Sequence, residues 1–125
     1  MATSANATTD ETGKLIAVIG DEDTVVGFLL AGVGHRNAEG QNFLVVNSDT
    51  EIPVVEEFFR KVTTRNDIGI VLINQFAANL IRPLVRDYQK MIPTILEIPS
   101  KDLPYDASQD SIMQRVNMVL GLQGQ

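Results

Sequence analysis

The sequence predicts an α/β protein built on an open parallel sheet. Short apolar runs alternate along the chain with segments whose apolar residues recur at helical spacing. The runs Lys14–Gly20 and Ile68–Asn74 are apolar at nearly every position, as expected for strands covered on both faces. Alternating strands and helices favour parallel pairing with right-handed crossovers. We therefore expect about four strands with helices on both faces, in the flavodoxin-like or receiver-like manner, followed by a C-terminal helix.

Four segments are predicted as strands. The last is bracketed by Pro93 and Pro99 and contains Glu97, which favours a solvated edge position in the sheet. The four segments are Lys14–Gly20, Asn42–Asn47, Ile68–Asn74 and Thr94–Ile98.

The two helices in the first half of the chain carry start and stop signals. We expect the first to be capped by Asp23 or Thr24 and to end at Gly34. The second has Pro53 in its first turn. Candidate caps for this second helix are Ser48, Asp49 and Thr50.

In the second half of the chain, Pro83 predicts a kink or break in the third helix, because proline has no amide proton to donate. The last helix is expected from about Ala107 to Leu120. We divide the chain into a disordered arm of small polar residues (1–12), the α/β domain (13–104), and the C-terminal helix with its tail (105–125). The arm lacks the basic start and apolar centre of a secretory signal.

Composition excludes several classes of function. The net charge is −6, which argues against nucleic acid and anionic lipid as partners. The chain has no Cys and one His, so disulfides, thiolate metal sites and histidine metal clusters are excluded. The longest uncharged apolar run, from Val25 to Gly34, is far shorter than the roughly 20 residues that span a bilayer, so we expect no membrane insertion.

The first predicted strand and helix resemble the opening of a nucleotide-binding domain, but their residues do not suit phosphate. The spacing of Gly20 and Gly27 fits no phosphate loop, and Asp21, Glu22 and Asp23 would repel an anion at the helix N-terminus. These acids leave open a weak cation site. Phosphotransfer of the receiver type is disfavoured because the third strand ends in Asn74, an amide, where an aspartate would accept the phosphoryl group. We predict no catalytic residue, cofactor or metal site.

Two helices have apolar residues that suggest a protein partner. The first helix is apolar nearly all round, which is typical of helices buried on more than one side. Neighbouring elements of the same domain or another protein could provide that cover. The last helix is amphipathic, and it could pack on the sheet or lie in a groove of a partner.

Three stretches, "GKLIAVIGDEDTVVGFLLAGVG", "DIGIVLINQ" and "IPTILEIPSKDLPYDASQDSI", closely resemble the F subunit of eukaryotic V-type proton-pumping ATPases. The resemblance covers about Gly13 to Met113. It implies a non-catalytic part of the central rotor shaft, which binds the D subunit and couples ATP hydrolysis in the catalytic head to rotation of the membrane ring and proton transport. It also implies a peripheral location on the cytosolic face of vacuolar or other endomembranes.

In that family the C-terminal helix lies along the coiled coil of the D subunit. The resemblance therefore makes Ile112, Val116 and Val119 candidate partner-binding residues, together with Ser100 and Lys101 in the preceding loop. Two alternatives remain: a degenerate receiver-like interaction module without phosphotransfer, and a small nucleotide- or metal-binding enzyme.

Overall fold

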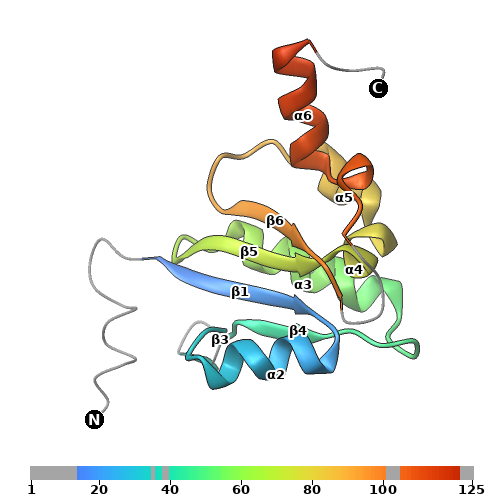
Figure 1. Cartoon of the computed structure of the whole chain (residues 1–125). Coiled ribbons are helices and arrows are strands. Elements are labelled where there is room, and N and C mark those ends of the chain that lie inside the picture. Colours follow the sequence, from blue (N-terminus) through green and yellow to red (C-terminus); the bar gives the residue numbers. More distant parts are fainter. Residues whose placement is uncertain (1–13, 35, 38–39, 101–104, 122–125) are drawn as a thin grey trace.

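Strand β1 (Leu15–Gly20) lies inside a four-stranded parallel sheet of order β4-β1-β5-β6. Its neighbours are β4 (Phe43–Val45) and β5 (Ile68–Asn74), and β6 (Thr94–Ile98) forms the edge beyond β5. The structure, a computed structural model, describes residues 14–34, 36–37, 40–100 and 105–121 (Figure 1). The predicted open parallel sheet and the edge position of its last strand are confirmed.

The second predicted strand is shorter than expected. It covers Phe43–Val45, although ladder-type hydrogen bonds continue on both sides of it. Val18 N donates to Asn42 O at 3.0 Å, and Val46 N donates to Gly20 O at 2.8 Å. A two-stranded antiparallel pair, β2 (Arg36–Asn37) and β3 (Gly40–Gln41), precedes it where the sequence predicted a loop.

One face of the sheet is covered by α3 (Ile52–Thr64), α4 (Gln75–Leu80) and α5 (Arg82–Asp87). The helices and the strands meet there in a single apolar core. Its fully buried aliphatic side chains include those of Ile19, Val55, Val62, Val71, Ile73 and Ile81. The predicted helical break at Pro83 is confirmed, since α4 ends before it and α5 carries it in its first turn.

The opposite face is covered less completely. Helix α2 (Glu22–Leu30) lies over β1 and β4 (Figure 1), and both Val25 of α2 and Val18 of β1 are buried. Val18 pairs in register with Leu72 of β5, and Leu72 pairs in register with Leu96 of β6. Leu72 is half-buried and Leu96 is exposed, so α2 does not cover the half of this face nearer β6.

The helix starts differ from those predicted. Helix α2 is capped by Asp21, whose Oδ1 accepts a hydrogen bond from Thr24 N at 2.7 Å, rather than by Asp23 or Thr24. It ends at Leu30, before the predicted Gly34. The N-cap of α3 is Glu51, without a side-chain bond. The expected caps of α3 lie in a turn in which Asn47 Oδ1 accepts from Asp49 N at 2.8 Å, so that prediction was wrong.

A buried amide joins the carboxyl ends of three strands. Asn74 is fully buried at the end of β5, where its Oδ1 accepts from Asp21 N at 2.7 Å and its Nδ2 donates to Pro99 O at 2.8 Å. Gly20 makes room for this side chain: a Cβ built at Gly20 would lie 2.0 Å from Asn74 Oδ1. Glycine at position 20 is therefore required by close approach.

We expect Gly20→Ala to lower the free energy of unfolding by about 2 kcal/mol or more, because the added methyl displaces a buried, doubly bonded amide. Urea denaturation followed by far-ultraviolet circular dichroism measures the change. The matched control is Gly27→Ala on α2, where the added Cβ meets nothing within 4 Å among the described residues. Equal stability of the Gly20→Ala variant and the parent would contradict the packing described.

Candidate partner-binding site

The C-terminal helix α6 (Ser111–Leu120) projects from the edge of the sheet at β6 (Figure 1). The single helix predicted from about Ala107 is divided into a short 3-10 turn, η1 (Ala107–Gln109), and α6. Asp110 separates the two and caps α6, accepting from Ile112 N at 3.0 Å. Of the residues from 111 to 120 that make up α6, Ser111 alone is buried, so most of this helix extends away from the core.

Glu97 anchors the start of α6 to the domain. Its side chain is 1 % exposed, and its Oε2 lies 2.6 Å from Arg82 Nη1. The same oxygen accepts from Ser111 N at 3.2 Å, and Oε1 accepts from Gln75 Nε2 at 3.2 Å. We call these four residues, Gln75, Arg82, Glu97 and Ser111, the Glu97 cluster. The sequence interpretation of Glu97 as a charge on a solvated edge was wrong, because the side chain points into the protein between β6 and the helices.

A second set of bonds holds the segment before α6. Gln75 donates from Nε2 to Asp106 O at 2.7 Å and accepts from Asp106 N at 2.7 Å through Oε1. Tyr105 donates from its hydroxyl to Asp110 Oδ2. Partial burial, this hydrogen bond and the negative charges of Asp110, Glu97 and Asp106 raise the pKa of Tyr105 to about 12. The chain is therefore attached to the domain at several points before α6 begins.

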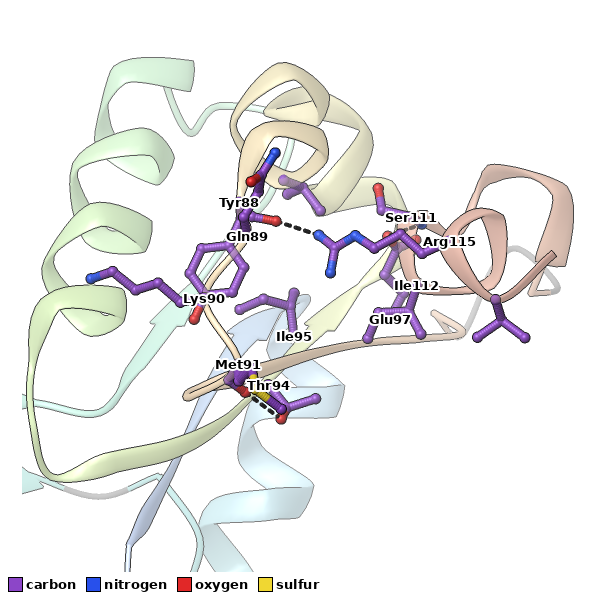
Figure 2. Close-up of a pocket in the computed structure, with 12 residues that line it drawn as sticks. Tyr88, Gln89, Lys90, Met91, Thr94, Ile95, Glu97, Ser111, Ile112 and Arg115 are labelled. Atoms are coloured by element: carbon purple, nitrogen blue, oxygen red, sulfur yellow. Dashed lines mark hydrogen bonds between the residues drawn. The ribbon is translucent and has the colours of Figure 1, made fainter. Parts of the chain in front are cut away.

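A groove separates α6 from the rest of the domain (Figure 2). It has a volume of about 310 Å³ and lies between α6, β6 and the loop that follows α5. Arg115 reaches across it from α6 and donates to the carbonyl oxygen of Tyr88 (Figure 2). Burial raises the pKa of Tyr88, and the positive charge of Arg115 partly opposes that shift. The apolar lining residues are Val85, Met91, Ile95, Ile112 and Val116.

The outer part of α6 and the loop beside the groove expose large apolar side chains. Val119 is 84 % exposed, and Met91, which lines the groove together with Val116, is 87 % exposed. Exposed large apolar side chains are typical of protein-interaction sites. We call the exposed apolar side chains of α6 and of the loop beside the groove the α6 patch; its members are Met91, Ile92, Val116, Met118, Val119 and Leu120.

The sequence-predicted site residues have different surroundings. Val116 and Val119 are exposed, whereas Ile112 is half-buried and lines the groove. Ser100 is half-buried, and Lys101 lies outside the described residues. Sequence reasoning missed Met91 and Ile92; their signal was a pair of large apolar residues in a short polar loop before Pro93.

The region that would hold a phosphoryl group in a receiver has structural bonds instead. Both polar atoms of the Asn74 side chain are hydrogen-bonded, and the Asp21 carboxylate caps α2. Within residues 14–34, 36–37, 40–100 and 105–121, no group of three or more His, Asp or Glu side chains is placed to hold a metal ion. In the same part of the chain, no helix combines the length and apolarity needed to cross a bilayer.

The fold and this projecting helix define a receiver-like α/β protein with an exposed apolar C-terminal element. Residues 16–116 match the family model described as ATP synthase (F/14-kDa) subunit, so the chain belongs to that family. It is 57 % identical over 104 residues to the V-type proton ATPase F subunit of Homo sapiens, covering 82 % of this chain and 87 % of the relative. It is 55 % identical over 108 residues to the F subunit of Dictyostelium discoideum, covering 86 % and 90 % respectively.

Among solved structures, the chain is similar to the V-type ATP synthase F subunit from Archaeoglobus fulgidus. The two are 28 % identical with a TM-score of 0.44, and the match covers 68 % of this chain and 96 % of the other. The family membership makes this chain a subunit of a multi-subunit complex, and both curated relatives are named as subunits of a V-type proton ATPase.

We expect Glu97→Ala to lower the free energy of unfolding by about 3–5 kcal/mol, because it leaves the Arg82 guanidinium largely buried without its carboxylate partner. Chemical denaturation measures the loss. Glu57→Ala, on the exposed surface of α3, is the control and should change stability by less than about 0.5 kcal/mol. A mild effect of Glu97→Ala would mean that β6 is a solvated edge at this point.

Tyr105 should make stability fall at high pH. Its folded pKa of about 12 exceeds the unfolded value of 10.0, so its contribution is complete below pH 10 and is lost as the pH rises toward 12. Tyrosinate absorbance should therefore appear at higher pH in the folded protein than in urea. Tyr105→Phe should remove the part of the tyrosinate absorbance that appears at the highest pH. An unchanged titration curve would contradict the raised pKa of Tyr105.

Proposed function

We propose that this chain is a non-catalytic rotor subunit that binds the D subunit of the V-type ATPase through the α6 patch. In this role it forms part of the shaft that couples ATP hydrolysis in the catalytic head to rotation of the membrane ring and proton transport. The observation that carries the proposal is an amphipathic helix that is anchored at its start by the Glu97 cluster and exposes apolar side chains further along. Such a helix can add its exposed face to the coiled coil of a partner.

A rotor part must transmit torque, and the attachment of α6 suits that requirement. Glu97 on β6 accepts hydrogen bonds from three helices. The donors are Gln75 of α4, Arg82 of α5 and Ser111 of α6. A buried, charge-assisted network fixes geometry more tightly than a flexible linker does. Force applied to α6 would therefore be passed to the sheet through directed bonds.

The hydrogen bonds of Asn74 support the proposed absence of catalysis. Its side-chain amide accepts from the backbone N–H of Asp21 and donates to the backbone carbonyl of Pro99. We also propose a peripheral location on the cytosolic face of vacuolar or other endomembranes, because F subunits of V-type proton ATPases align with 82 % and 86 % of this chain. The partner residues proposed are Val116 and Val119, extended by Met91 and Ile92, with Ile112 as the support beneath. Ser100 and Lys101 stay predictions as partner contacts.

We expect Val119→Asp to weaken binding to the D subunit at least tenfold, since a charge would enter an apolar contact, while the melting temperature stays unchanged. Binding is measured with the purified D subunit by calorimetry. Leu30→Asp is the matched control, because Leu30 is 85 % exposed on α2 at a distance from α6. Undiminished binding of the Val119→Asp variant, or equal loss in both variants, would refute the role of the α6 patch.

A further inference from the structure

Helix α2 exposes an apolar face that the fold does not use. The sequence makes this helix apolar nearly all round, yet it buries only Val25 fully. Leu30 is 85 % exposed and Val26 is 43 % exposed. Val26 and Leu30 lie one turn apart on the outer side, with Gly27 and Ala31 beside them, and both small residues are exposed. We call these four residues the α2 outer face.

Packing among the described residues does not require a glycine at position 27. A glycine in a helix interior is less favourable than alanine, because it loses more backbone freedom on folding. At Gly27, a Cβ would meet no atom within 4 Å among the described residues, in contrast to Gly20 and Gly69. The glycine does not serve internal packing, but it would let a second backbone approach the helix closely.

The α2 outer face has a definite charge pattern. Glu22 and Asp23 are exposed in the first turn, one turn before Val26 and Gly27. Between Glu22 and Leu30 the helix contains no Lys or Arg. The surface is therefore acidic at its N-terminal end and apolar toward its C-terminal end, which requires a ligand with cations at one end only.

Two other parts of the chain, residues 1–13 and α6, offer little to cover this surface. Residues 1–13 contain one Met and three Ala as their only apolar side chains. The α6 patch lies beside β6, at the opposite edge of the sheet from β4, over which α2 packs (Figure 1). A helix bound along α6 therefore leaves the α2 outer face open.

We propose that the α2 outer face docks an amphipathic helix of another subunit of the V-type ATPase, distinct from the helix that binds α6. The proposal rests on the proposed function, since it places this chain within that assembly. The docked helix runs antiparallel to α2, with aliphatic residues against Val26, Gly27 and Leu30. Its basic C-terminal end lies beside Glu22 and Asp23, where lysine or arginine also complements its own helix dipole. Glu22 and Leu30 are about 12 Å apart along the axis of α2, at a rise of 1.5 Å per residue. In the docked helix, the basic residues therefore lie about two turns C-terminal to the residues that contact Leu30.

The test uses a purified V-type ATPase assembled with this chain as its F subunit. Photoreactive benzoylphenylalanine replaces Leu30, and the matched control carries it at Glu57, exposed on α3. The expected crosslink from position 30 joins a helix of another subunit that has Lys or Arg about two turns C-terminal to the crosslinked residue. The control must not label the same segment. Absence of a crosslink, or a crosslink to a second copy of this chain or to a non-helical segment, overturns the proposal.

Gly27→Ala separates docking from folding. In the isolated protein it should raise the melting temperature by a few degrees, because alanine is the better helix former. In the assembled complex, the same variant combined with the photoreactive group at position 30 should crosslink severalfold less, because the added methyl blocks close approach. An undiminished crosslink would refute the docking mode.

Experiments can distinguish failure of the proposed docking at α2 from failure of the proposed binding of the D subunit at α6. Binding of the purified D subunit to the α6 patch should be the same in the Gly27→Ala variant and the parent. Loss of this binding in Gly27→Ala would show that α2 contacts the D subunit itself, which overturns the claim of a second, distinct helix. Conversely, Val119→Asp tests the α6 patch without touching α2.

Discussion

The buried ion pair between Glu97 and Arg82 is the constraint on which the C-terminal half of the structure depends. A carboxylate with a 1 % exposed side chain is unfavourable unless its oxygens are bonded, and here both oxygens accept hydrogen bonds. The donors come from α4, α5 and α6. Satisfying one charge on the edge strand therefore fixes where three helices meet it.

That arrangement explains how α6 can project and still be well oriented. A helix that packs its apolar face on its own sheet is positioned by burial, but such packing removes the face from any partner. In α6, polar bonds at the N-terminal end, from the Asp110 cap and from Ser111 to Glu97, set the direction. The apolar residues further along remain exposed. Anchoring by polar bonds thus leaves the hydrophobic surface available for binding.

The sheet order separates the two exposed apolar surfaces. Because β4 and β6 are opposite edges, α2 and α6 lie on different sides of the domain. Their immediate charges differ as well, with Glu22 and Asp23 beside the α2 outer face and Arg115 beside the α6 patch. A domain with two separated, differently charged surfaces can contact two neighbouring proteins at once, which suits a component of a multi-subunit machine.

The sequence by itself determined the order of the four strands of the parallel sheet along the chain, the bounds of β5 and β6, and the helical break at Pro83. Continuous apolar runs and proline act locally, so pattern alone reveals them. It also identified Asn74 as the residue that disfavours phosphotransfer. Only the tertiary structure decided that Glu97 faces inward, that Asp21 caps α2, and that Met91 is exposed at the groove beside α6. The positions of Glu97 and Met91 depend on contacts between residues far apart in the chain. The cap of α2 depends on which of three adjacent acids lies close to the free backbone amides at the start of the helix. The periodicity of apolar residues encodes neither.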